Sequence, residues 1–271
     1  MIAEDSGKQA CLFPEFGHPI AYEQPLNERI RNCMRLEHLF FGIEFGINGG
    51  SAWDARDALA RMLEVSDYLI RTDIKAELIK ELEREISTFN GLRNNPGVSP
   101  EALDITISSI NDVLIKLKSP DCQPGNALRN DELANQVRQR ISIPSGTCNF
   151  DLPALHFWLN IEPRERAERM NAWMDDLQII ETATRTILKL IRSSSNPRTV
   201  IAKEGFYQQQ IDSATPCQIV RVVVGPAVDQ FPEISGGKHR FTIRFYTQNG
   251  TWDRPVQVKS DTEFELHCCG I

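Results

Sequence analysis

The sequence predicts an α+β protein in which an all-helical domain precedes an antiparallel β-domain. Up to about residue 196, apolar residues recur every three to four positions, which is typical of amphipathic helices. Beyond Pro197 apolar and polar residues alternate, and Gly, Pro, Asn and Asp separate the runs, as in strands joined by turns. Helices and strands therefore occupy separate parts of the chain, which is the arrangement of an α+β fold.

This change of period divides the chain into three segments. Residues 1–18 have no periodic pattern and are predicted to form a disordered leader. Residues 19–196 are predicted to form the helical domain, and residues 197–271 the antiparallel β-domain. The short segment "PIAYEQ" (19–24) is a candidate strand of the β-domain, so it would join the two ends of the chain.

Four helices are predicted in the first half of the chain. The first starts at Pro25, because proline suits a first helical turn, and the glycines of "FGINGGS" (45–51) end it. Ser51 is expected to cap the second helix and Asp73 the third, since their side chains accept hydrogen bonds from free N–H groups. The loop "NNPGVSP" (94–100) precedes the fourth. The apolar stripes are Leu26, Ile30, Cys33, Met34, Phe40 and Phe41; Leu59, Met62, Leu63 and Leu69; Ile74, Leu78, Leu82, Ile86 and Phe89; and Leu103, Ile107, Ile110, Leu114 and Leu117.

Three further helices are expected after the polar loop at 119–126. The first contains Leu128, Leu133 and Val137. Asp151 is expected to cap a short helix in "LPALHFWLN" (152–160). The last, a long helix over about 163–194, has an apolar stripe that consists of Trp173, Leu177, Ile180, Leu188 and Ile191.

Four strands are predicted after Pro197: "TVIAKEG" (199–205), "CQIVRVVVG" (217–225), "HRFTIRFYT" (239–247) and "TEFELHC" (262–268). In the third strand the apolar side chains of Phe241, Ile243 and Phe245 share one face. The other face carries Arg240, Thr242, Arg244 and Tyr246.

The composition is that of a soluble globular protein that does not bind nucleic acid generally. The net charge is −7, whereas nucleic-acid binders usually have a basic excess. The β-domain contains eight basic and eight acidic residues, so the negative charge belongs to the helical part. The seven cysteines include no C-x-x-C pair, as in a reducing compartment. Because the sequence has neither a secretory signal nor an apolar run of about 20 residues, we expect a cytoplasmic protein with no membrane insertion.

The motifs of enzymes and metal sites find little support. "SGGKHR" (235–240) lacks the spacing of a phosphate-binding loop and is followed by a strand instead of a helix. Cys148, Asp151 and His156 lie within nine residues and could form a nucleophilic site, but Asp151 is more simply a helix cap and Cys148 a buried thiol. The five histidines show no metal-ligand spacing. The C-terminal "CCGI" resembles a prenylation motif but continues a strand. We therefore expect no enzyme, no cofactor and no metal.

Arg240 and Arg244 have two interpretations. They stand on the same side of a strand, about 13 Å apart at ~3.3 Å per residue. In the first interpretation they pair with Glu263 and Glu265 on a neighbouring strand, an arrangement that contributes only tenths of a kcal/mol on a surface. In the second they bind carboxylates of a partner, with Tyr246 and Phe206 holding apolar side chains.

Five stretches, in order along the chain, resemble the ZapD family of bacterial cell-division factors. They are "PLNERIRNCMRLEHLF" (25–40), "IKAELIKELER" (74–84), "LANQVRQRISIPSGTCNFDLPALHFWLN" (133–160), "EGFYQQ" (204–209) and "FPEISGGKHRFTIRF" (231–245). The resemblance covers the chain from about residue 19 to its end.

The resemblance implies a helical domain with a β-domain, a homodimer and no catalysis. Members of this family bind the C-terminal tail of FtsZ, the tubulin-like GTPase of the division ring, and crosslink FtsZ filaments into bundles. The chain would then be cytoplasmic and recruited to the mid-cell ring. The tail is a short peptide with acidic and apolar residues. It is therefore the kind of partner that the second interpretation of the arginines requires.

The basic pocket of the family would fall on Arg240 and Arg244. The resemblance adds Arg71, Arg35 and His156, and spacing adds Lys75. One departure is the acidic pair Asp131 and Glu132, where the family often has basic residues. A different class of function is a regulator that binds an anionic small molecule in the same basic groove.

Overall fold

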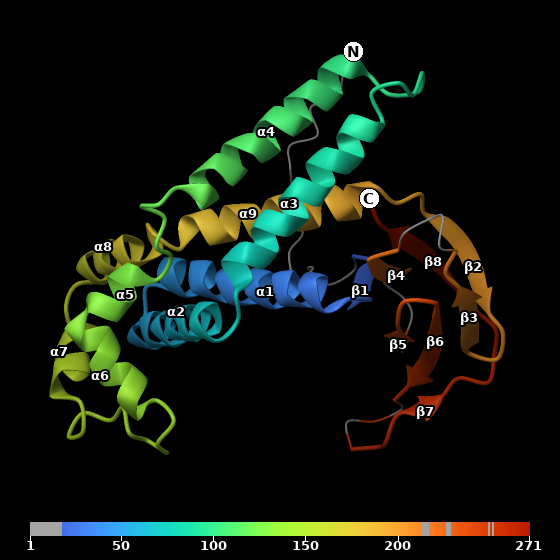
Figure 1. The fold of residues 1–271 in the computed structure, drawn as a ribbon. Coiled ribbons are helices and arrows are strands. Elements are labelled where there is room, and N and C mark those ends of the chain that lie inside the picture. The colour runs from blue at the N-terminus through green and yellow to red at the C-terminus, as the bar shows by residue number, and fades with distance from the viewer. Residues whose placement is uncertain (1–17, 213–216, 226–228, 249, 251) are drawn as a thin grey trace, which may run out of the picture. The chain divides into compact units, whose positions relative to one another are not determined.

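The structure is a computed structural model, and it describes residues 18–212, 217–225, 229–248, 250 and 252–271 (Figure 1). The predicted leader, residues 1–18, lies outside the described residues except for His18. The described chain divides into two compact units. The helical unit comprises Asn32–Leu188, and the β-unit comprises the described residues up to Arg31 together with Lys189–Ile271. The predicted α+β class is confirmed.

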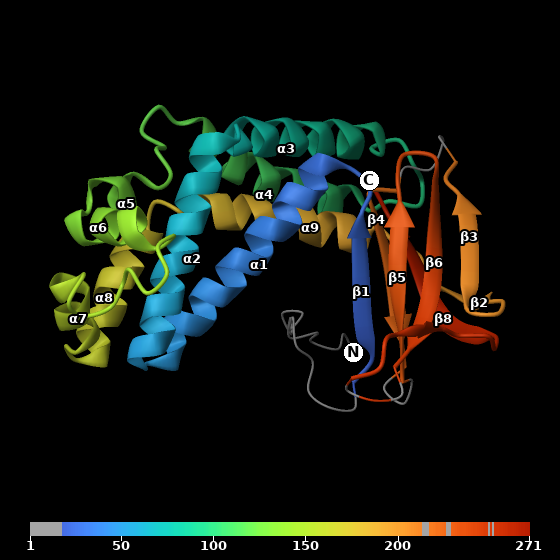
Figure 2. The same ribbon diagram turned by 90° about the horizontal axis from the view of Figure 1, so that it is seen from below.

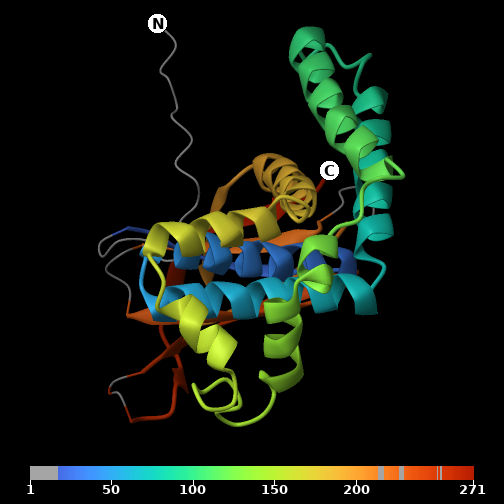
Figure 3. The ribbon, with the colours of Figure 1, turned by 90° about the vertical axis from the view of Figure 1, so that its left-hand side faces the viewer.

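In the first half of the chain most helices begin and end close to the predicted signals. Their bounds are α1 Glu28–Gly49, α2 Ala52–Arg71, α3 Ile74–Gly91, α4 Pro100–Lys118, α5 Asn126–Asn130, α6 Glu132–Arg140, α7 Pro153–Leu159, α8 Pro163–Met174 and α9 Gln178–Ser193. In the helical unit α3 and α4 lie side by side as a hairpin (Figure 3), and α2 contacts α5, α6, α7 and α8. The predicted stripe of α4 is entirely buried.

Ser51 caps α2 as predicted. The backbone N–H of Asp54 donates to Ser51 Oγ at 3.1 Å, and the backbone N–H of Ser51 donates to Asp54 Oδ2 at 3.0 Å. Asp73 occupies the capping position of α3, but its side chain makes no capping hydrogen bond. The pair Ser51 and Asp54 therefore forms a capping box, which satisfies two free N–H groups at once.

Two predicted helix starts are wrong. Pro25 does not begin α1: it is the last residue of a strand, and Asn27 accepts a hydrogen bond from Ile30 N at 2.9 Å. Asp151 does not cap α7, because its carboxylate pairs with Arg140 at 3.2 Å. In both places the residue that the sequence pattern assigned to a helix start has another role: Pro25 belongs to a strand, and Asp151 belongs to an ion pair.

Two predicted single helices are each divided. Asp131 has an extended backbone and accepts from Ala134 N at 2.9 Å, so it ends α5 and caps α6. Between α8 and α9 the chain turns at Asp175–Leu177, where Asp176 Oδ2 accepts from Ala127 N at 2.8 Å and Leu177 is buried. These breaks depend on side-chain partners distant in sequence, which a helical period does not reveal.

The β-unit consists of two antiparallel sheets. The strands are β1 Ile20–Pro25, β2 Arg198–Ala202, β3 Phe206–Gln210, β4 Ile219–Val224, β5 Gln230–Gly236, β6 Arg240–Thr247, β7 Val256–Gln257 and β8 Thr262–Cys269. Sheet A has the order β1–β4–β8–β2, and sheet B has the order β3–β6–β5 with β7 beside the end of β6 (Figure 2). The predicted N-terminal strand is confirmed as β1, whereas β3, β5 and β7 were not predicted.

One apolar core joins the two sheets. Sheet A contributes Val220, Val222 and Leu266, and sheet B contributes Phe241, Ile243 and Phe245, all of them with no exposed surface. The alternation predicted for β4, β6 and β8 therefore decides which residues face inward. The opposite face of sheet B is left for polar side chains.

Among the described residues, no helix is both long enough and apolar enough to cross a membrane. Nor do three or more His, Cys, Asp or Glu residues of the described segments gather in a way that would hold a metal ion.

Candidate functional site

The outer face of β6 carries the candidate site. Phe241, Ile243 and Phe245 are buried in the core, so the intervening side chains of Arg240, Thr242 and Arg244 must point away from it. Both arginines are exposed. The alternation predicted from the sequence is confirmed for this strand.

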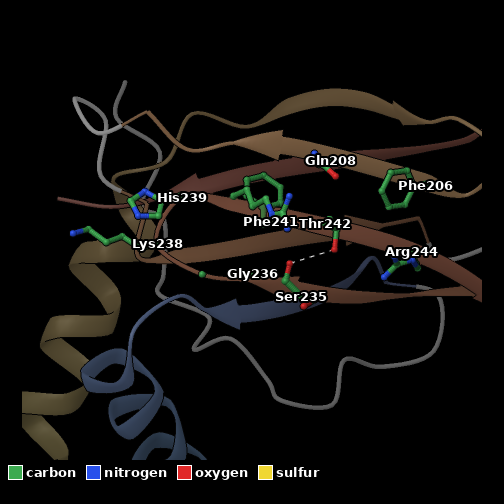
Figure 4. A pocket seen from close by; sticks show the side chains of 11 residues that line it. Phe206, Gln208, Ser235, Gly236, Lys238, His239, Phe241, Thr242 and Arg244 are labelled. Atoms are coloured by element: carbon green, nitrogen blue, oxygen red, sulfur yellow. Dashed lines mark hydrogen bonds between the residues drawn. The ribbon is translucent and has the colours of Figure 1, made fainter.

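A hollow of about 530 Å³ lies over this face. Its lining residues come from β3, β5, β6 and the turn between β5 and β6: Phe206, Gln208, Ser235, Gly236, Gly237, Lys238, His239, Arg240, Phe241, Thr242 and Arg244. Figure 4 shows Lys238 and His239 at one end and Phe206 with Arg244 at the other. The described residues that line the hollow include two arginines, one lysine and one histidine, and none of them is acidic. The hollow therefore suits an anionic ligand.

Strand register sets the positions of the lining residues. On one side of β6, Phe206 of β3 lies opposite Arg244, and Gln208 lies opposite Thr242. On the other side Ser235 of β5 lies opposite Thr242, whose hydroxyl donates to the carbonyl oxygen of Ser235 at 3.5 Å. The pleat therefore brings polar and aromatic groups of three strands to one surface.

Within the segments that the structure describes, Arg244 contacts an aromatic ring and no carboxylate. Its Cζ lies 5.3 Å from the centroid of the Phe206 ring, a cation–π contact that does not itself use the N–H groups of the guanidinium. Glu233 of β5 faces Arg244 in the register. Even so, neither Arg244 nor Arg240 forms an ion pair with any carboxylate in the described part of the chain.

The interpretation in which Glu263 and Glu265 neutralise the arginines is wrong. Both glutamates lie on β8, which belongs to sheet A and pairs with β4 and β2. Glu265 instead contacts His267, whose Nε2 lies 2.6 Å from Glu265 Oε1. β6 and β8 both alternate apolar and polar residues, so the sequence suggested that they pair. They belong instead to different sheets, which pack face to face.

The turn between β5 and β6 presents the other two basic residues. The N–H of Gly237 donates to the carbonyl oxygen of Arg240 at 3.0 Å, and the N–H of Ile211 donates to that of His239 at 2.9 Å. Lys238 and His239 are both exposed. The segment "SGGKHR" thus joins two strands, in agreement with its rejection as a phosphate-binding loop that precedes a helix.

The other predicted site residues belong to the helical unit. Arg71 is the exposed last residue of α2, and Lys75 lies in the first turn of α3, where its Nζ donates to the carbonyl oxygen of Cys122 at 2.7 Å. The two are therefore not on successive turns of one helix. Arg35 is exposed on α1 and His156 on α7. Their assignment to the same site as Arg240 stays a prediction.

Sequence reasoning missed several lining residues, namely Gln208, Ser235, Lys238, His239 and Thr242. Gln208 and Ser235 were missed because their strands were not predicted. One signal was present in the sequence: the pair Glu204-Gly205 directly precedes two aromatic residues. In the structure both residues of the pair have positive φ, 49° and 69°, and form the tight turn that leads into β3. A two-residue turn followed by Phe206 and Tyr207 indicates a second strand.

Two other motifs can be placed. Cys148 Sγ lies 3.4 Å from Asp151 Oδ2, but Asp151 is paired with Arg140 and His156 is exposed. No hydrogen bond links His156 to the thiol among the described residues. Cys268 and Cys269 end β8, as the strand interpretation of "CCGI" predicted.

Comparison with known proteins identifies the family. The model of the ZapD family, described as "Cell division protein", matches residues 34–244. The cell division protein ZapD of Methylococcus capsulatus is 38% identical over 250 residues, which cover 92% of this chain and 98% of the relative. That of Nitrosomonas eutropha is 36% identical, with 93% and 100% covered, and that of Coxiella burnetii is 31% identical, with 93% and 98% covered. The chain therefore belongs to the ZapD family of cell division proteins.

Proposed function

We propose that this chain is a non-enzymatic cell-division factor that binds the C-terminal tail of FtsZ and crosslinks FtsZ filaments. The observation that carries the proposal is the hollow on sheet B, which has four basic lining residues and an aromatic ring beside Arg244. A short peptide with acidic and apolar residues matches both features. Carboxylates would bind the guanidinium groups, and an apolar side chain would contact Phe206.

Bundling requires more than one tail site per particle. A single tail in a single hollow is expected to bind with micromolar affinity, about −8 kcal/mol. A monomer with one such site would only decorate a filament. We therefore propose a homodimer, in which two equivalent sites join two filaments and repetition along the filaments stabilises the bundle.

Arg71, Arg35, His156 and Lys75 are retained as proposed contributors to tail binding. The support is the family resemblance, together with the exposure of Arg71, Arg35 and His156. Lys75 has weaker support, because its ammonium group already donates to a backbone carbonyl.

The test is sedimentation of FtsZ polymers, with and without their tail, in the presence of the chain. We expect the double variant Arg240→Glu/Arg244→Glu to lose bundling while its fold and dimer persist. Arg254→Glu/Lys259→Glu is a matched control, because both residues are exposed in the β-unit and the charge change is the same. Arg71→Glu, compared with Arg164→Glu on the exposed face of α8, tests the helical contributors in the same assay.

Normal bundling by the double arginine variant would contradict the assignment of the site. The alternative, a regulator that binds an anionic small molecule, is favoured only by the volume of the hollow, which suits a small ligand. It predicts thermal stabilisation by organic acids or nucleotides and none by the tail peptide. Stabilisation by the tail peptide that Arg244→Glu removes would exclude that alternative.

A further inference from the structure

Five large apolar side chains are exposed at one end of the helical unit. Trp53, Phe150 and Phe157 are 73%, 80% and 73% exposed, and Ile141 and Ile143 are 42% and 52% exposed. Trp53 lies in the first turn of α2, Phe157 lies in α7, and the other three lie between α6 and α7. Figures 1 and 2 both show the start of α2 at the same end of this unit as α6 and α7. We call these five residues the apolar patch.

Arg56 connects Trp53 to the segment between α6 and α7. Its Cζ lies 5.2 Å from the centroid of the Trp53 ring, and its Nη2 donates to Thr147 Oγ1 at 2.6 Å. Thr147 comes three residues before Phe150, so the contact places the tryptophan beside the segment that carries Phe150. Trp53 is therefore not an isolated exposed side chain.

A buried arginine ties α7 to the turn that precedes α2. Arg166, on α8, is only 5% exposed. Its Nη1 donates to the carbonyl oxygens of Leu159 at 3.0 Å and Ile161 at 2.5 Å, and its Nη2 donates to that of Gly50 at 2.6 Å. Leu159 is the last residue of α7, and Gly50 comes three residues before Trp53. One buried side chain therefore holds the parts of the patch on α2 and α7 together.

Backbone hydrogen bonds fix the segment between α6 and α7. The N–H of Ile143 donates to the carbonyl oxygen of Arg140 at 3.0 Å, that of Gly146 to Ile143 at 2.9 Å, and that of Leu152 to Cys148 at 2.9 Å. A Cβ on Gly146 would lie 2.6 Å from the carbonyl oxygen of Arg140, so these turns are close enough to require glycine. The backbone that presents the exposed side chains is already ordered, which lowers the entropy cost of binding.

The size of the apolar patch is that of a protein interface. A large aromatic side chain has about 150–250 Å² of surface that a partner can cover. Three such side chains, mostly exposed, and two isoleucines offer roughly 600 Å². This is the upper end of the ~300–600 Å² that monomeric proteins expose as one apolar patch. With a polar rim it approaches the ~800 Å² that each partner contributes to a stable interface.

The charged side chains beside the apolar patch balance one another. Asp54 and Arg56 follow Trp53 closely in the sequence, and Arg140 and Asp151 flank the segment between α6 and α7. Arg140 also pairs with Asp151 at 3.2 Å. A surface with an excess of one charge would repel its own copy, whereas this one can meet itself across a two-fold axis. An acidic peptide, by contrast, finds no basic excess among these four residues.

We propose that two copies of the chain associate through the apolar patch. The inference rests on the homodimer of the proposed function and deepens it, because it names the surface that the two copies share. Each copy would bury Phe150 and Phe157 against the patch of the other, with Arg140 and Asp151 at the rim. No lining residue of the hollow on sheet B belongs to the patch, so each copy would keep its own tail site.

Sedimentation equilibrium of the full chain tests the proposal. We expect Phe150→Ala/Phe157→Ala to raise the dissociation constant of the dimer by about 100-fold or more, because aromatic side chains at the centre of an interface carry much of the binding energy. Both side chains are exposed in the single chain, so its far-UV circular dichroism should not change. Ile105→Ala/Ile115→Ala is the matched control, since these residues are 71% and 69% exposed on α4 and should leave the dissociation constant unchanged.

The fluorescence of Trp53 gives a second measurement that leaves the patch intact. Trp158 and Trp173 are buried, so in a Trp252→Phe chain Trp53 is the tryptophan that acrylamide can reach. We expect acrylamide quenching to decrease as the chain concentration rises through the dissociation constant of the dimer. Quenching that stays constant while the chain dimerises would overturn the proposal.

The outcomes separate this inference from the proposed tail site. We expect the Phe150→Ala/Phe157→Ala variant to bind the tail peptide with unchanged affinity but to bundle no filaments. A dimer that this variant leaves unchanged would overturn the inference, and a loss of peptide affinity with the dimer intact would assign the patch to the tail instead. Normal bundling by Arg240→Glu/Arg244→Glu would contradict the tail site and leave the dimer surface untouched.

Discussion

Glu85 is a buried carboxyl group in α3 that has no hydrogen-bond partner among the described residues. Burial, with the nearby charge of Glu81, raises its pKa to about 9, although Arg84 opposes the shift. The folded state therefore binds a proton that the unfolded state, with an ordinary pKa of 4.5, releases above that pH. The contribution of Glu85 to the free energy of unfolding is fully present below pH 4.5 and is lost as pH rises from there to about 9.

We expect Glu85→Gln to stabilise the chain at neutral and alkaline pH, because glutamine is neutral at every pH. The gain should be close to zero near pH 4.5 and should grow by about 1.4 kcal/mol per pH unit, to roughly 4 kcal/mol at pH 7.5. Urea unfolding at several pH values measures it. Glu64→Gln on the exposed face of α2 is the control. Unfolding curves of wild type and Glu85→Gln that stay a constant distance apart across this range would contradict the account.

At the scale of elements, the capping box of α2 is the clearest case of local sequence deciding where a helix begins. Ser51→Ala removes the acceptor for the N–H of Asp54 and should destabilise the chain by about 1 kcal/mol. Chemical denaturation measures the change. Ser87→Ala is the control, because Ser87 is exposed within α3 and its replacement leaves every cap intact. Equal effects of the two substitutions would show that Ser51 does not act as a cap.

The helices and the buried strands could be predicted because each carries a pattern of its own. The stripe of α4 and the alternation of β6 are local in sequence, and the core selects the same residues. β3 could not be predicted in this way: "FYQQQ" has no alternation, and its place in sheet B depends on pairing with β6. The break at Asp131 also depends on distant partners, since Arg169 and Trp173 donate to its carboxylate.

Most of the candidate site that could be predicted from the sequence lies on β6, and Phe206 is the one residue of β3 that was named. Arg240 and Arg244 follow from the period of two, which places both on the solvent side. That no carboxylate of the described segments forms an ion pair with them does not follow, because it depends on β8 being in the other sheet. The contact of Arg244 with Phe206 requires the register of two strands, one of which carries no clear pattern.

At the scale of the whole molecule, the proposed dimer predicts that bundles and single tail contacts respond differently to competition. Free tail peptide should displace a bound tail from one site near its own dissociation constant. Bundles should persist until the peptide exceeds that constant by about 10²–10⁴-fold, because many contacts must open together. Light scattering of FtsZ with added peptide measures this.

Both kinds of contact should weaken as salt rises, since the groups of the hollow act through charge. Dispersal of bundles at peptide concentrations near the single-site constant would contradict a divalent crosslinker. A monomeric chain in sedimentation equilibrium would contradict it independently.

The central place of β6 in sheet B affects whether the proposed site could distinguish the chain direction of a peptide. β6 is hydrogen-bonded to β3 on one edge and to β5 on the other. Its backbone N–H and C=O groups are therefore already paired and cannot bind an added strand. A peptide at the proposed site would therefore bind through side chains and through the backbone of Gly236 and Gly237, without pairing as a strand with β6. Its N-to-C polarity is then not imposed by main-chain pairing, and an acidic segment with its residue order inverted should still be accepted.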